Sequence, residues 1–145
     1  VLAFSSHTRT RCTVWEVRGW DEPWSVGAAR LGVLAPCGYT RIGAALRHAT
    51  AGLSRVSARR RLLLLISDGK ATDYDRYEGR YGDADVRQAL IEARRCGIQA
   101  HALAIDHGAR EHLPAMFGAG HWHVMAKPAD LPDILGSVYA RLTAA

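Results

Sequence analysis

Cysteine is scarce in this sequence: only three occur, Cys12, Cys37 and Cys96, and no Cys-x-x-Cys pair is present. An odd number of widely spaced cysteines does not build a disulfide framework, so we expect a reducing compartment and a cytoplasmic location. The longest apolar run, from Leu62 to Ile66, has five residues, whereas a membrane-spanning helix needs about 20. The first residues, 1–4, lack the basic leader of a secretory signal. We therefore predict no signal peptide and no membrane insertion.

Motifs for enzyme catalysis are also missing. Gly69-Lys70 invites comparison with a phosphate-binding loop, but Leu64 stands where that loop needs a glycine and Ala71 where it needs Ser or Thr. The sequence contains neither His-Glu-x-x-His nor Gly-x-Ser-x-Gly, the signatures of many zinc proteases and serine hydrolases. We therefore predict that the chain is not an enzyme.

Two local clusters leave weaker chemical alternatives open. His121 and His123 fall on one face of a predicted strand and could form part of a zinc site, but no third ligand is evident nearby. The carboxylates of Asp73, Asp75 and Glu78 could supply acid and base catalysis. Pairing of these carboxylates with arginines of the same loop is the simpler interpretation.

The composition is that of an ordinary globular protein, with 145 residues, 48% hydrophobic and 23% charged, and a formal net charge of +5. This length predicts one domain over 1–145 with a single core. Part of the positive excess lies in the run from Arg59 to Arg61, which we interpret as a solvated turn between a helix and a strand. Because no aromatic residue is interleaved with this run, it does not predict a nucleic-acid groove.

Apolar strand-like runs alternate with helical patterns along the chain. Strands are predicted where apolar residues alternate or form short unbroken runs, and helices where they recur three and four positions apart. This alternation predicts an α/β fold with right-handed crossovers and a doubly wound, mostly parallel sheet that carries helices on both faces. The predicted strands are 1–4, 13–17, 62–66, 98–105 and 121–125, and the predicted helices are 25–34, 41–53, 83–95, 111–117 and 128–142.

Ligands of such sheets bind outside the carboxyl ends of the strands. Asp68 closely follows the buried run 62–66, and Gly69 lets the chain turn away. Thr40 falls at a predicted helix start on the same loop face, where its hydroxyl could cap the helix or bind a metal ion. Together Thr40 and Asp68 offer the oxygen ligands that Mg²⁺ prefers. Capping of a turn or helix by each residue is the alternative.

At this point the sequence resembles a known family. Thr40 and Asp68 resemble the second and third parts of the metal-ion-dependent adhesion site (MIDAS) of von Willebrand factor A (VWA) domains. Segments 39–49, 62–70 and the Tyr-Glu-Gly-Arg-Tyr-Gly stretch at 77–82 resemble the carboxyl-terminal domain of the NorD-type family, with CbbO-type proteins as close relatives. The resemblance implies a VWA-type, Rossmann-like fold and a non-enzymatic, metal-dependent adaptor. It also implies a MoxR-type AAA+ ATPase as partner and activation or maturation of nitric oxide reductase as the output.

One part of the family pattern is missing. The family's site opens with Asp-x-Ser-x-Ser after its first strand, and this motif does not occur here. We therefore expect the domain to lack the family's first strand and helix, so that Thr40 and Asp68 are the metal ligands that remain. Binding of Mg²⁺, or of Mn²⁺ or Ca²⁺ in its place, should be weak, and the sheet should need a substitute strand.

The loop from Asp73 to Gly82 has the composition of a binding surface, because Tyr and Arg are enriched in interface hot spots. The predicted partner-binding residues are Tyr74, Arg76, Tyr77, Glu78 and Arg80. The alternative is a loop folded over the sheet edge, with tyrosines such as Tyr81 as packing and the arginines paired with the loop's own carboxylates.

Two other functions stay open at the level of sequence. A CbbO-like adaptor in Rubisco activation would share the mechanism and differ only in its target. A Mg²⁺-dependent phosphohydrolase of Rossmann-like fold would use Asp68 and the carboxylates that begin at Asp73, but the sequence supplies no evident nucleophile.

Overall fold

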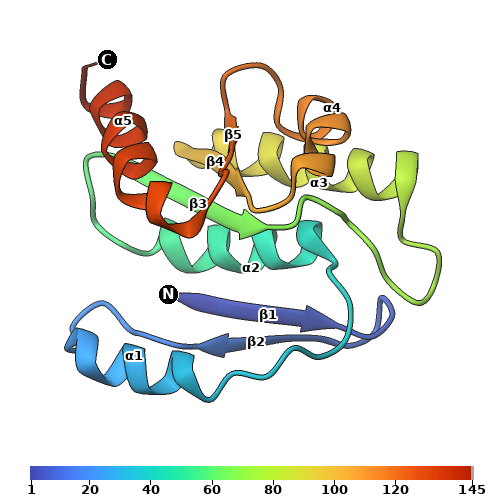
Figure 1. Cartoon of the computed structure of the whole chain (residues 1–145), viewed down its shortest axis with the longest axis horizontal. Coiled ribbons are helices and arrows are strands. Elements are labelled where there is room, and N and C mark those ends of the chain that lie inside the picture. Colours follow the sequence, from blue (N-terminus) through green and yellow to red (C-terminus); the bar gives the residue numbers. More distant parts are fainter. Residues whose placement is uncertain (145) are drawn as a thin grey trace.

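The computed structural model describes residues 1–144, without the side chains of His107 and residues 142–144, so residue 145 of the predicted domain lies outside the described residues. Strands and helices alternate from α2 onward, whereas β1 and β2 follow one another directly, and the α/β class is confirmed (Figure 1). The elements are β1 (Leu2–Ser6), β2 (Cys12–Glu16), α1 (Trp24–Gly32), α2 (Ile42–Ser54), β3 (Arg61–Ser67), α3 (Gly79–Arg95), β4 (Ile98–Ala104), η1 (His107–Glu111), α4 (Leu113–Phe117), β5 (Trp122–Val124), η2 (Pro128–Asp130) and α5 (Leu131–Ala144).

The strands form two separate sheets. Strands β3, β4 and β5 are parallel and lie in that order, whereas β1 and β2 form an antiparallel hairpin of their own. The short loop 7–11 explains the hairpin, because parallel neighbours need a crossover of a dozen or more residues. The prediction of a parallel sheet therefore holds for three strands. Within residues 1–144, β1 and β3 each keep one edge without a strand partner.

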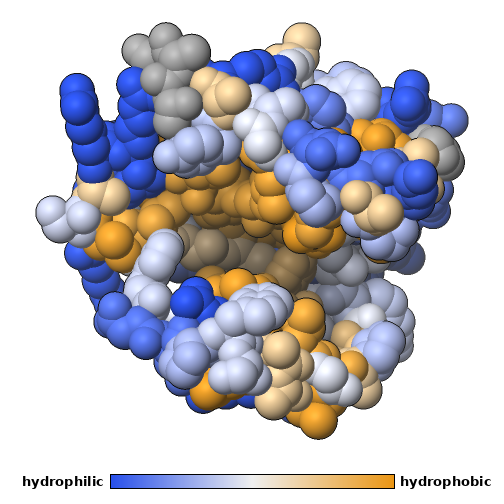
Figure 2. All heavy atoms as spheres, turned by 60° about the vertical axis from the view of Figure 1, so that its left-hand side comes forward, coloured by the Kyte–Doolittle hydropathy of each residue, from blue (hydrophilic) through white to orange (hydrophobic). Residues whose placement is uncertain are grey.

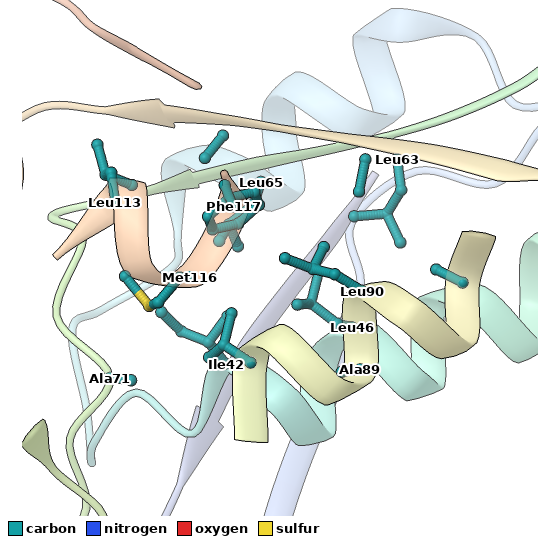
Figure 3. Close-up of a cluster of buried hydrophobic side chains, with 14 of the residues drawn as sticks. Ile42, Leu46, Leu63, Leu65, Ala71, Ala89, Leu90, Leu113, Met116 and Phe117 are labelled. Carbon is teal, nitrogen blue, oxygen red and sulfur yellow. The ribbon is translucent and has the colours of Figure 1, made fainter. Parts of the chain in front are cut away.

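The main core lies on one face of the parallel sheet. Leu63 and Leu65 of β3 point to this face, beside Ala100 and Ala102 of β4, their register partners. Helices α2 and α3 cover these strands, and α4 closes the far end of the cluster with Met116 and other apolar side chains (Figure 3). Small alanines on β4 let the helices approach the sheet closely. Other buried members of the cluster include Ile42, Leu46, Val86, Leu90, Leu113 and Phe117.

The opposite face of the parallel sheet is only partly covered. Helix α5 packs on this side with Val138 buried, yet Ile66 of β3 is 49% exposed. Apolar strands of parallel sheets are normally covered on both faces. Figure 2 shows an apolar hollow between the two halves of the molecule. The structure therefore leaves apolar surface open beside the unpaired edge of β3.

A chain of hydrogen bonds joins this face to α5. The Nε2 atom of His101 lies 2.7 Å from Nδ1 of His123, and Nε2 of His123 lies 3.4 Å from the guanidinium of Arg141. Arginine can only donate hydrogen bonds, so His123 accepts at Nε2 and donates from Nδ1 to His101. Both imidazoles are therefore neutral in this arrangement. Burial, with the charges of His123, Arg141 and His121, lowers the pKa of His101 to about 4.

We predict that acid weakens the fold through His101. Its pKa lies near 4 in the folded chain and near 6.5 in the unfolded chain, so the folded state is fully stable above pH 6.5 and loses stability as pH falls toward 4. Urea unfolding from pH 7 to 4 should show a loss of up to ~3 kcal/mol from this group. The variant His101→Gln should have a flatter profile, and an equally steep one would contradict the assignment.

Helix α3 begins four residues earlier than the periodicity predicts, at Gly79 rather than Asp83. The glycines at 79 and 82 suggest a loop in the sequence, but Gly82 is buried on the helix against Ala71. An added Cβ at Gly82 would lie 3.0 Å from the carbonyl oxygen of Ala71. This glycine is needed for close packing, not to end a helix.

Candidate functional site

The predicted site lies where β3 and β4 end, and loops from distant parts of the sequence meet there. Residues 7–11 link β1 to β2, residues 33–41 lead into α2, and residues 68–78 join β3 to α3. Two isolated bridges connect these loops, one between Ser6 and Tyr39 and the other between Thr40 and Thr72. These bridges form one loop face out of the hairpin, the start of α2 and the segment after β3.

Thr40 is held through its backbone. Its amide donates to the carbonyl of Thr72 over 2.9 Å, and the Thr72 amide donates back over 3.2 Å. Helix α2 has Arg41 as its N-cap residue without a side-chain cap bond, so the hydroxyl of Thr40 does not serve as the cap. Thr40 also lines a pocket whose other walls come from β1, Trp15 of β2 and residues 33–39. Thr40 therefore lies on the loop face beside a hollow.

Asp68 lies at the same edge and is exposed to solvent. One carboxylate oxygen, Oδ1, accepts hydrogen bonds from the Lys70 amide at 3.1 Å and the Ser67 hydroxyl at 3.3 Å. Gly69 has a φ of +84°, and an added Cβ would lie 2.4 Å from the Cβ of Ala109, so this turn needs glycine. Asp68 is thus a solvent-exposed carboxylate with one oxygen bound within its own turn.

The most buried charges on the loop face belong to a cluster that the sequence did not reveal. Arg41 is buried, and its Nε lies 3.0 Å from Oδ2 of Asp73, whose side chain is fully buried. The same guanidinium also pairs with Asp75. The sequence-based pairing of these two carboxylates with Arg76 and Arg80 is therefore wrong. Arg41 lies more than thirty positions away from both, and no local pattern points to it.

Backbone amides complete the surroundings of these carboxylates. Thr8 and Tyr74 donate to Asp73 over 2.8 and 2.7 Å, and Arg9 donates to Asp75 over 2.9 Å. Burial opposes ionisation of Asp73, but the hydrogen bonds from Ser6, Thr8, Tyr74 and Arg41 outweigh it, so the pKa of Asp73 is lowered. The cluster thus ties the hairpin loop to the segment after β3.

Tyr77 lies beneath the loop face instead of on it. Its ring is fully buried, with the guanidinium carbon of Arg41 4.2 Å from the ring centroid. Its hydroxyl donates to Asp85 and accepts from the Gly43 amide at 3.2 Å. Burial and Asp85 raise the pKa of Tyr77. Tyr77 therefore supports the loop, and the prediction that it contacts a partner directly is wrong.

The other predicted partner-binding side chains are exposed. Tyr74 is 71% exposed and stacks on His7, with ring centroids 5.7 Å apart; Tyr39 lies 6.4 Å from both rings. His7 and Tyr39, which the sequence did not single out, thus join Tyr74 in an exposed aromatic cluster directly beside Thr40. Arg76, Glu78 and Arg80 are also exposed. Tyr81, expected as packing, is 63% exposed on the first turn of α3.

Two negative observations concern metal-binding clusters and membrane spans. Among the residues that the structure describes, no three His, Cys, Asp or Glu side chains are grouped to hold a metal ion. No helix within the same residues combines the length and apolarity needed to cross a bilayer.

Comparison with known proteins finds relatives named NorD. The chain is 43% identical over 143 residues to Protein NorD of Brucella suis and 44% identical over 129 residues to Protein NorD of Stutzerimonas stutzeri. It is also 45% identical over 144 residues to an uncharacterized protein of Pseudomonas aeruginosa. These alignments cover 98%, 88% and 98% of this chain but only 23%, 21% and 23% of the relatives.

The chain is therefore homologous to a segment of NorD proteins and spans about a quarter of the length of the curated relatives it matches. This confirms the NorD part of the resemblance. No family model and no solved structure matches the chain, so the relation to von Willebrand A domains remains a prediction.

The charge cluster leads to a stability prediction. Replacing Arg41 with alanine should lower the free energy of unfolding by about 3–5 kcal/mol, because it leaves the carboxylate of Asp73 buried without its cation. Arg76→Ala, which removes the partner expected from sequence, should change it by less than about 0.5 kcal/mol. Equal losses in the two variants, measured by urea unfolding, would contradict the pairing seen here.

Proposed function

We propose that the chain forms most of a doubly wound, von Willebrand A-type domain and acts as a non-enzymatic adaptor. Its loop face, with the aromatic cluster of His7, Tyr39 and Tyr74 beside Thr40, would contact a partner protein. Exposed aromatic rings beside arginines are typical of interface hot spots. The observation that carries this proposal is that Arg41, Asp73 and Tyr77 hold these loops rigidly while the aromatic rings stay exposed.

A divalent cation would assist this contact. Thr40 and Asp68 supply a hydroxyl and a carboxylate on the loop face, and hard cations such as Mg²⁺ prefer oxygen ligands. A carboxylate from the partner would complete the coordination. Two side chains make a weak site, so binding by these residues alone should be weak, whether the ion is Mg²⁺, Mn²⁺ or Ca²⁺.

The unpaired edges of β1 and β3 suggest how the site becomes complete. An extended segment placed between them would join the two sheets and cover part of the apolar hollow. We propose that residues elsewhere in the longer protein supply this strand, together with further oxygen ligands. The relatives have ample additional chain, because the match covers 23% of their length.

The partners in this proposal are a MoxR-type AAA+ ATPase and nitric oxide reductase, which the complex would activate or mature. The name NorD of the relatives favours this target over Rubisco. A phosphohydrolase gains no support, because Asp73 is bound to Arg41 and to two backbone amides and cannot act as a free base.

We expect the longer protein that contains this chain to bind its purified ATPase or reductase in Mg²⁺ and to lose at least tenfold in affinity in EDTA. Asp68→Ala should lose as much in Mg²⁺, since it removes a proposed ligand. Asp21→Ala, a change to an exposed carboxylate between β2 and α1 that belongs to none of these loops, is the matched control. Equal affinity with and without the ion, measured by biolayer interferometry, would contradict the proposal of a metal-dependent adaptor.

Calorimetric titration with Mg²⁺ or Mn²⁺ separates the metal from the partner. The longer protein should bind the ion, whereas the 145-residue chain should bind it much more weakly or not at all. If neither protein binds the ion, the metal-binding part of the proposal is wrong. The aromatic cluster would then be a contact that needs no metal.

A further inference from the structure

Arginines from three parts of the chain lie at the amino-terminal ends of the parallel strands. This is the end of the sheet opposite the loop face. Arg61 opens β3 and is the register partner of Ile98, which opens β4. The segment that leads into β3 and the end of α3 that leads into β4 therefore both enter the sheet at its amino-terminal end. The carboxyl ends of α3 and α5 and the start of β3 all lie at the left of Figure 1.

Five arginines on these segments are exposed: Arg55, Arg59, Arg60, Arg94 and Arg95. None of them takes part in an ion pair among the residues that the structure describes. The Nε of Arg61 donates to the carbonyl of Val56 over 3.1 Å and holds the preceding loop against the strand. We call the five exposed arginines, without Arg61, the basic edge.

The end of α5 extends the basic edge on one side. Arg141 lies 3.4 Å from Nε2 of His123 on β5. Burial lowers the pKa of His121, and the positive charges of Arg94 and Arg141 lower it further.

Acidic side chains do not neutralise this edge. The segments 55–61, 88–98, 119–123 and 134–141 contain one acidic residue, Glu92, and its carboxylate is bound to Arg47 of α2 at 2.7 Å. A field of one sign at one end of the molecule attracts an oppositely charged ligand and speeds its association.

The side chains around the basic edge indicate which kind of ligand it could bind. No large apolar or aromatic side chain is exposed within 55–61 or 94–98, so these segments offer nothing to insert into a membrane or to stack on bases. The guanidinium group instead presents a planar fork that pairs with carboxylates, and also with phosphates, through two hydrogen bonds. These features favour an acidic protein segment.

We propose that the basic edge binds a segment rich in Asp and Glu on a second protein, so that the adaptor contacts different partners at its two ends. Strand β3 separates the two surfaces by its seven residues, or about 20 Å. This spacing allows simultaneous contact. The biological role of the basic edge rests on the proposed adaptor function. Its expected affinity for acidic chains rests on the exposed arginines alone.

The test uses a fluorescent ten-residue polyglutamate peptide and the complete chain, with binding measured by anisotropy at low and physiological salt. The double variant Arg94→Glu/Arg95→Glu should bind at least tenfold more weakly than the parent chain. The matched control Arg9→Glu/Arg76→Glu has the same net charge but changes exposed arginines at the loop face, and its affinity should stay within threefold. Asp68→Ala should not change peptide binding, which separates this proposal from the metal-dependent one.

Equal weakening in the two double variants would mean that only the net charge acts, and it would overturn the proposal. Tighter binding of duplex DNA or of vesicles with one-third anionic lipid than of the peptide, with the same dependence on Arg94 and Arg95, would overturn the assignment to an acidic protein. Circular dichroism confirms that each variant is folded; Arg59→Glu/Arg60→Glu, which changes a loop, serves as the second test should the helix variant unfold.

Discussion

The ion pair between Arg41 and Asp73 is the interaction on which the arrangement of the loop face depends. The hairpin and the parallel sheet share no strand ladder, and their loops meet through isolated bridges and this cluster. Buried charges cost several kcal/mol unless they are paired and hydrogen-bonded. Asp73 meets that condition with Arg41 and the amides of Thr8 and Tyr74, and it thereby fixes the positions of three loops at once.

Much of this fold could be predicted from apolar periodicity. The run 62–66 and the pattern of 41–53 correspond closely to β3 and α2, because burial on a sheet or one helix face leaves a direct mark on the sequence. The sequence did not predict the partner of Asp73, since Arg41 lies on a different element and ion pairs leave no periodic signal. It also missed His101, whose contact with His123 depends on the register of β4 and β5.

The tyrosines of the loop 73–82 show the limit of composition as a guide to function. Tyr74 and Tyr77 have the same side chain and lie three residues apart, yet one is exposed beside His7 and the other is buried against Arg41. Composition indicated that the loop is suited to binding. Only packing decides which tyrosine is exposed and which one is buried beneath the loop.

The two ends of the parallel sheet differ in a way that suits the proposed adaptor function. One end carries aromatic rings and oxygen donors held by a buried ion pair, and the other carries arginines with few acidic neighbours. The free edge of β3 runs from one end to the other, and an apolar hollow lies between the two halves of the molecule (Figure 2). A strand added there would stiffen the connection between the hairpin and the sheet, and with it the loop face. The geometry of the proposed binding surface and the proposed completion of the sheet are thus expected to be coupled.

Amide hydrogen exchange tests the central role of Arg41 most directly. In Arg41→Ala, the amides of Thr8, Arg9 and Tyr74, which donate to Asp73 and Asp75, should exchange at least tenfold faster relative to the β3–β4 ladder. A core variant of similar stability, Leu90→Ala, should instead accelerate the ladder and these amides together. If Arg41→Ala also changed all amides in proportion, the ion cluster would not be what holds the loop face in place.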